Sequence, residues 1–100
     1  MRVGTPADRV AHEEVERRGV FYLENSGRRV AELTYSRVND GMVIIDHTEV
    51  DPSLGGQGVG RMLLDAAVEW ARETGTKFKV VCPFARAQFA RDPSIRDVLG

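Results

Sequence analysis

The sequence predicts an α/β (α+β) domain with a mixed, mostly antiparallel sheet. Runs of β-forming residues occupy the first half of the chain, an amphipathic helix follows over residues 58–74, and a short β-like run comes directly after it. Because a strand, a helix and a strand in this order form a right-handed crossover, the last strand should lie parallel to the strand before the helix. A length of 100 residues predicts one domain, residues 1–100.

Composition and charge narrow the class of protein. Hydrophobic residues make up 42 % and charged residues 29 % of the chain, with a net charge of −1, so we expect a globular protein without a nucleic-acid partner. Cys82 is the single cysteine, which excludes an internal disulfide and a cysteine-based zinc cluster, and we expect no metal. No stretch reads as a signal peptide or a membrane span, so the expected location is cytoplasmic, with no membrane partner.

Two runs of β-forming residues predict a β-hairpin. Residues 19–24 and 29–38 carry these runs, and the turn-forming residues Asn25-Ser26-Gly27 separate them. Residues 1–15 have mixed charge and weak periodicity, so we expect only a frayed end or a short edge strand there. Because an exposed edge on that side would permit pairing between copies, we expect a monomer or a weak homodimer.

Residues 42–50 predict a central strand because they are apolar on both faces, and Pro52 ends the strand. The last residues of this strand are polar. Strict alternation divides them between two faces, with Ile45, His47 and Glu49 on one and Asp46, Thr48 and Val50 on the other. A β-bulge near the end of the strand would exchange these faces.

The clearest predicted element is the amphipathic helix over residues 58–74, which Gly75 terminates. Apolar residues recur there with helical spacing and are predicted to face the core, namely Val59, Met62, Leu63, Ala66, Ala67, Trp70 and Ala71. The row predicted to face solvent is Arg61, Asp65 and Glu69.

The C-terminal part predicts one strand and one or two short helices. Residues 77–82 form the strand, and Pro83 stands where a further helix would begin. Residues 84–90 can form about two helical turns. A short terminal turn is expected over residues 94–99.

A glycine-rich stretch, residues 54–61, lies between the central strand and the long helix. Four glycines in six positions leave the backbone open to an anion, because no Cβ atoms stand in the way. The following helix begins with unpaired N–H groups and the positive end of its dipole. The stretch could therefore hold a pyrophosphate by its main chain, although glycines also occur where a chain only bends sharply.

Several reactive side chains should lie beside this stretch. Parallel strands joined by a helix end at the same edge of the sheet, which is where open sheets bind ligands. Glu49 and Cys82 lie near the ends of the two strands, and His47 is close by in the sequence. We therefore expect a carboxylate, an imidazole, a thiol and a phosphate cradle to converge.

Three motifs in this sequence resemble a known family. The runs His47-Thr48-Glu49-Val50, Gly56-Gln57-Gly58-Val59-Gly60-Arg61 and Cys82-Pro83-Phe84 are similar to those of small single-domain proteins in the GNAT superfamily of N-acetyltransferases. The resemblance covers roughly residues 20–93. It implies a truncated GNAT fold that binds acetyl-CoA (coenzyme A), with one parallel pair of strands splayed around the cofactor. It also implies an open acceptor side, because the paired helices that longer relatives insert between their first two strands are missing.

The resemblance also implies which residues contact the cofactor. The pyrophosphate would lie on residues 55–60, and the pantetheine arm would run between the splayed strands. The implied cofactor-binding residues are Thr48, Glu49, Val50, Gly55, Gly56, Gln57, Gly58, Val59, Gly60, Arg61, Cys82 and Phe84. Two positions depart from the family pattern, because Gly55 replaces the usual Gln or Arg and Asp92 stands where relatives usually have His.

Acetyl transfer to an amine needs a base and hydrogen-bond donors at the thioester oxygen. Glu49 or His47 could take the proton, directly or through water. Alternatively, Cys82 could accept the acetyl group first, which would give an acyl-enzyme. We favour direct transfer with Cys82 lining the site. Each residue also has a purely structural alternative: Cys82 could be a buried thiol, His47 could bond a neighbouring carbonyl, and Glu49 could be a solvated strand end.

The predicted function is an acetyl-CoA-binding N-acetyltransferase that acts on a small-molecule or protein amine. The alternative is a non-catalytic module that binds or senses acyl-CoA. A third interpretation, a surface used only for protein interaction, predicts no cofactor and makes the glycine-rich stretch incidental.

Overall fold

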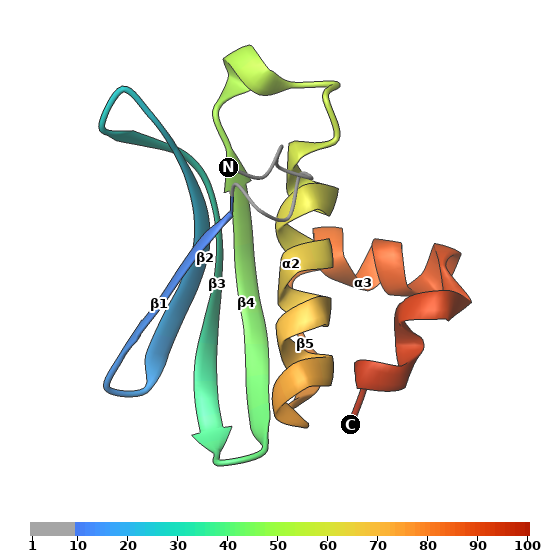
Figure 1. Cartoon of the computed structure of the whole chain (residues 1–100). Coiled ribbons are helices and arrows are strands. Elements are labelled where there is room, and N and C mark those ends of the chain that lie inside the picture. Colours follow the sequence, from blue (N-terminus) through green and yellow to red (C-terminus); the bar gives the residue numbers. More distant parts are fainter. Residues whose placement is uncertain (1–9) are drawn as a thin grey trace.

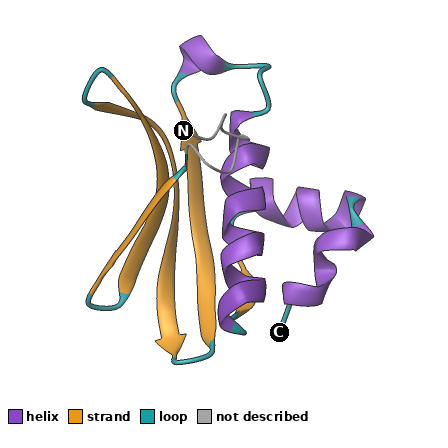
Figure 2. Ribbon diagram, in the orientation of Figure 1, coloured by secondary structure: helices purple, strands orange, loops and turns teal. Residues whose placement is uncertain are grey.

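The computed structural model describes residues 10–100 and has a twisted sheet with helices packed on one of its faces (Figures 1 and 2). The strands are β1 (Ala11–Val15), β2 (Arg18–Asn25), β3 (Arg28–Asn39), β4 (Met42–Val50) and β5 (Lys77–Val80). The helices are α2 (Val59–Thr74) and α3 (Pro83–Arg91), with short 3-10 turns at Pro52–Leu54 and Pro93–Val98. The predicted elements therefore occur in the predicted order. Of the N-terminal segment 1–15, residues 1–9 lie outside the described part and residues 11–15 form β1.

The sheet has the predicted mixed topology. The strands lie in the order β1-β2-β3-β4-β5, and each of the first three pairs is antiparallel. The strand β5 pairs with β4 in parallel, from Met42 beside Lys77 to Ile45 beside Val80. Helix α2 forms the crossover between these two strands (Figure 1). The mixed sheet with one parallel pair confirms the predicted fold class.

The parallel pair separates beyond Ile45. β5 ends at Val80, whereas β4 continues to Val50. The N–H groups of Val81 and Cys82 both donate to the carbonyl of Ile45, at 3.1 and 3.2 Å, and the chain then turns into α3. Among the described residues, residues 47–50 keep their partners on β3, and no residue of the 46–50 segment has a partner on β5. One edge of this segment is therefore open.

A bulge at Asp46 exchanges the faces of the β4 end. Tyr35 pairs with Ile45 and the preceding Thr34 pairs with His47, so Asp46 is the additional residue. After the bulge, Thr48 lies opposite the fully buried Leu33. Strict alternation was therefore wrong here: Thr48 and Val50 share the helix-covered face with Ile45, and the exposed side chains of His47 and Glu49 lie on the opposite face.

The buried side of α2 is shifted around the helix relative to the predicted stripe, because it also includes Leu64 and Val68. Its buried residues are Val59, Leu63, Leu64, Ala67, Val68 and Ala71, while the predicted Met62, Ala66 and Trp70 are only partly buried. This difference arises because α2 packs against the sheet on one side and against α3 and the C-terminal 3-10 turn on the other (Figure 1). Trp70 lies at the edge of the core, where its ring stacks on that of Tyr35 with centroids 5.3 Å apart.

A polar network ties β1 to β3 at the margin of this core. The hydroxyl of Tyr35 donates to Glu14 at 2.6 Å and lies 2.7 Å from Nε2 of His12. Arg37 binds the same carboxylate through two nitrogens, at 2.6 and 2.9 Å. The hydrogen bond from Arg37 is the main reason that the pKa of Glu14 falls from 4.5 to about 2. Glu14 is therefore an ionised, structural carboxylate.

Candidate functional site

The glycines between β4 and α2 serve different purposes. Gly56 and Gly58 have φ angles of +79° and +71°, a conformation that favours glycine, and a Cβ atom at either position would meet nothing within 4 Å. At Gly60, by contrast, a Cβ atom would lie 2.9 Å from the ring of Phe84. Gly60 therefore makes room for Phe84, whereas Gly56 and Gly58 leave the backbone of the turn open to its surroundings.

The first turn of α2 suits an anion. Its N-cap residue, Gly58, offers no side chain to the helix, and the first turn contains no acidic residue. The helical hydrogen bonds begin with the N–H of Met62, which donates to the carbonyl of Gly58 at 3.0 Å. The N–H groups of residues 59–61 therefore have no acceptor within the helix, and the positive end of its dipole is not offset by a carboxylate.

A cavity of about 420 Å³ lies where this turn meets the open end of β4. Its lining comes from the end of β4, the glycine-rich stretch, the first turn of α2 and the inner side of α3. The residues are Thr48, Val50, Leu54, Gly55, Gly56, Gly58, Val59, Gly60, Arg61, Phe84 and Gln88. Leu54 and Gln88 were not predicted as site residues. Gln88 lies one helical turn after Phe84, and this spacing was the signal that could have identified it.

Three predicted cofactor-binding residues do not line this cavity. Gln57 is exposed, and Glu49 lines a separate cavity of about 240 Å³ together with Glu32 of β3. Cys82 is 2 % exposed, and its Sγ lies 3.3 Å from the hydroxyl of Thr48, which does line the cavity. Cys82 is therefore placed behind the cavity wall.

The predicted reactive side chains occupy two sides of the sheet. Cys82 belongs to the core on the helix-covered side, whereas His47 and Glu49 are exposed on the other side. The splayed end of β4 separates the two sets. A molecule held in the opening between the strands would thus have the thiol on one side and the imidazole and carboxylate on the other.

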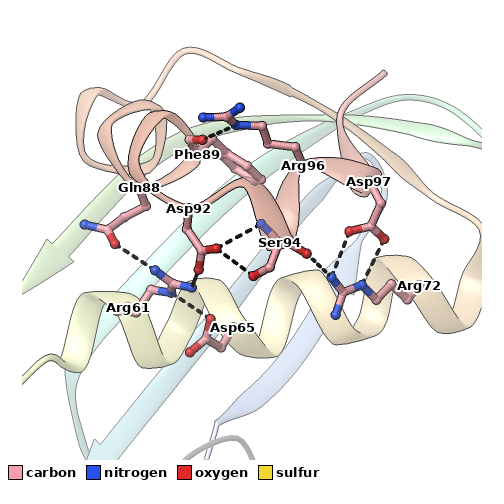
Figure 3. A network of polar contacts seen from close by, with 9 residues as sticks. All are labelled: Arg61, Asp65, Arg72, Gln88, Phe89, Asp92, Ser94, Arg96 and Asp97. Carbon is pink, nitrogen blue, oxygen red and sulfur yellow. Dashed lines mark hydrogen bonds and ion pairs between the residues drawn. The ribbon is translucent and has the colours of Figure 1, made fainter.

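Arg61 joins α2 to the C-terminal part of the chain (Figure 3). Its guanidinium donates to Asp65 at 2.8 Å, to the side-chain oxygen of Gln88 at 3.0 Å and to Asp92 at 2.5 Å. The hydroxyl of Ser94 and the guanidinium of Arg61 lower the pKa of Asp92 to about 2. Asp65 and Glu69 of the predicted solvent-facing row are exposed, whereas the side chain of Arg61 is only partly exposed because two carboxylates hold it at the cavity wall.

The sequence matches a known family along most of its length. A family model described as GCN5-related N-acetyl-transferase matches residues 20–98. A search of curated proteins found no significant match.

Solved structures share the fold. A GCN5-like candidate N-acetyltransferase from Staphylococcus aureus is 38 % identical, with 92 % of this chain and 89 % of that chain covered and a TM-score of 0.69. The ribosomal-protein-S18-alanine N-acetyltransferase from Escherichia coli is 24 % identical over 78 % of this chain and 53 % of its own, with a TM-score of 0.63. The aminoglycoside N-acetyltransferase AAC(6')-Iy, solved in complex with CoA, is 15 % identical over 81 % of this chain and 68 % of its own, with a TM-score of 0.53.

The last two structures are too distant to show more than the fold, but the family match and the first structure are sufficient for an assignment. This assignment confirms the predicted enzyme class, an acyltransferase, and the predicted cofactor. The chain belongs to the GCN5-related N-acetyltransferase (GNAT) family, whose cofactor is acetyl-CoA.

Proposed function

We propose that this protein transfers an acetyl group from acetyl-CoA directly to an amine of a small molecule or a protein. The observation that carries the proposal is the cavity formed by the first turn of α2, the glycine-rich stretch and the open end of β4. When bound there, acetyl-CoA supplies the activated acetyl group as a thioester. We also propose that residues 1–100 act as one domain, in the cytoplasm, as a monomer or a weak homodimer.

The main chain fits the two ends of such a ligand. The N–H groups of residues 59–61 lack helical acceptors and would bind the diphosphate, and the glycines at 56 and 58 let it approach the backbone. The 46–50 segment of β4 has an open edge. Its peptide groups can therefore form hydrogen bonds with the amides of the extended pantetheine arm of acetyl-CoA. Side-chain charge contributes less, because Arg61 is already paired with two carboxylates.

The proton of the attacking amine would be taken on the exposed face of the sheet. An ammonium group cannot attack a thioester, so a base must first remove a proton from the amine. Glu49 and His47 are both exposed on that face, beside the opening between the strands, and either can act directly or through water. The acceptor would approach from the same face, because helices cover the other one (Figure 1).

The buried position of Cys82 favours direct transfer over an acyl-enzyme. Its thiol is 2 % exposed and shares a hydrogen bond with Thr48, whereas a nucleophilic thiol should be partly accessible and in an electropositive setting. Cys82 would then support Thr48, which lines the cavity.

A binding or sensing module is the second candidate, and one observation favours it. β1 ends at Val15 and β2 begins at Arg18, so no helix shapes the acceptor side between these strands. Such a module would bind acetyl-CoA without efficient transfer.

Turnover of acetyl-CoA with and without a panel of amines distinguishes the two candidates. Direct transfer predicts that at least one amine accelerates CoA release, and that Glu49→Gln or His47→Gln lowers this rate without weakening acetyl-CoA binding. Glu32→Gln is the matched control, because Glu32 lies opposite Glu49 on the same face. Tight binding with a slow turnover that no amine accelerates would contradict transfer and support the sensing module.

A further inference from the structure

Within the described part of the chain, residues 10–100, the outer edge of β5 is largely uncovered. β5 is the last strand of the sheet, and on this side Phe78 forms an isolated parallel bridge with Leu99. The N–H of Gly100 donates to the carbonyl of Phe78 at 3.0 Å. Since backbone groups point to the same side at every second residue of a strand, the N–H and carbonyl of Val80 point to this edge too. Val80 has no backbone partner there among the described residues.

A groove of about 510 Å³ runs beside this edge, between β5, α3 and the chain around Leu99. Its apolar lining includes Phe78 and Phe89, whose rings meet edge to face with centroids 6.5 Å apart. Both rings are firmly packed, being 1 % and 4 % exposed. These rings support the groove from below, and its accessible apolar floor, beside the unpaired strand groups, is formed by Val80 and by Leu99, which is 38 % exposed.

The groove has a basic rim. Lys79, Arg86 and Arg96 line it, and none of the lining residues that the structure describes is acidic. Lys79 donates to the main-chain oxygen of Gly100, and Arg96 donates to the carbonyls at the end of α3, so neither is paired with an acidic side chain. Among residues 10–100, no side-chain hydrogen bond or ion pair of Arg86 occurs, and its backbone N–H donates to the carbonyl of Cys82 at 2.9 Å. The rim is thus a local excess of positive charge on a chain whose net charge is −1.

We propose that this edge binds an extended acidic segment of another protein as an additional β-strand beside Val80. The unpaired backbone groups can bond to a peptide backbone, the apolar floor accepts alternate side chains, and the basic rim favours acidic ones. A second copy of this chain fits less well, because Glu13 and Glu14 of the opposite edge strand are already paired with Arg29 and Arg37. The groove shares no lining residue with the cavity assigned to acetyl-CoA, so the two sites are separate.

The test uses a capped octapeptide of alternating valine and glutamate, with an alternating valine and lysine peptide as the charge control. Amide spectra of the protein should shift at Val80 and Val81 with the acidic peptide, and the Val80 amide should exchange more slowly with solvent. Arg86→Glu should weaken binding about tenfold, because it reverses a charge at the rim. Arg91→Glu is the matched control, since Arg91 is exposed on the same helix and lies outside the groove.

A second peptide, methylated on alternate backbone nitrogens, tests strand addition without altering the protein and should bind much more weakly. Equal binding of the two charge forms, or equal loss with Arg86→Glu and Arg91→Glu, would overturn the acidic specificity. Unchanged exchange at Val80 would overturn strand addition. Protection of Val80 that grows with protein concentration in the absence of peptide would assign the edge to a second copy instead.

Discussion

At the scale of single residues, the four glycines of the 55–60 turn show why one pattern can have several causes. Gly56 and Gly58 are required by positive φ angles, and Gly60 by the ring of Phe84. The sequence predicted an open turn from their number alone. It could not distinguish Gly60, because Phe84 is far along the chain and meets it only after α3 has packed on α2.

Gly58→Leu should weaken acetyl-CoA binding and also destabilise the fold. A side chain in the left-handed region costs roughly 1–2 kcal/mol. Gly75→Leu is the matched control, because Gly75 has a φ of +74° at the other end of the same helix. Calorimetric titration and thermal unfolding should show similar losses of stability in both variants, with lost affinity only in Gly58→Leu. Equal affinities would remove the turn from the binding site.

Cys82→Ala should leave turnover within a few fold if transfer is direct. The substitution removes a buried thiol and its contact with Thr48, so the main expected effect is lower stability. Rapid-quench mass spectrometry of the unmodified protein checks the other route. A thioester on Cys82 that forms and decays at the turnover rate would contradict direct transfer.

Glu14 should make the fold sensitive to acid. Its pKa is 4.5 in the unfolded chain and about 2 when it is bound by Arg37. The contribution of ionised Glu14 to folding stability is therefore complete above pH 4.5 and is lost as the pH falls toward 2. The linked contribution is at most about 3 kcal/mol. Urea unfolding from pH 6 to pH 2 should therefore show a steeper loss of stability in the unmodified protein than in Glu14→Gln. The exposed Glu24→Gln serves as control, and parallel curves for all three proteins would refute the role of Glu14.

At the scale of elements, the positions of the reactive residues depend on a bulge and on helix packing. The bulge at Asp46 moves His47 and Glu49 to the face opposite Cys82. The sequence left open a bulge near the end of this strand, but whether it forms depends on the pairing with β3. Arg61 was placed on a solvent-facing row because its partners Gln88 and Asp92 lie 27 and 31 residues away, beyond the reach of helical periodicity.

Asp92→Asn should strengthen acetyl-CoA binding. The substitution removes a negative charge at the cavity wall and leaves Arg61 less neutralised, so an anionic ligand should bind about threefold more tightly at low salt. Asp97→Asn is the matched control. It removes the same charge from the other ion pair in Figure 3, that of Asp97 with Arg72, and Arg72 does not line the cavity. Titrations at low and high salt should show an affinity gain for Asp92→Asn that salt abolishes. A loss of affinity, or the same gain in both variants, would show that Asp92 acts in another way.

At the scale of the whole molecule, the order of the elements was enough to predict the topology. A strand, an amphipathic helix and a short strand determine a parallel pair, and the preceding hairpin determines the antiparallel remainder. The helices cover one face of the sheet (Figure 1). The exposed His47 and Glu49 lie on the other face, which is the proposed acceptor side. The acceptor itself could not be predicted, because under the proposed function its recognition would depend on the shape of this exposed face rather than on a motif. No helix of the described part is long and apolar enough to cross a bilayer.

The most direct test of the central claim is a titration of the labelled protein with acetyl-CoA, followed through its backbone amide resonances. We predict saturable shifts first at residues 55–61 and then along the 46–50 segment of β4, with the amides of residues 78–81 at the outer groove unaffected. Resonances of the 55–61 segment that stay unchanged at saturating acetyl-CoA would contradict the account, because the cavity would then not be the cofactor site.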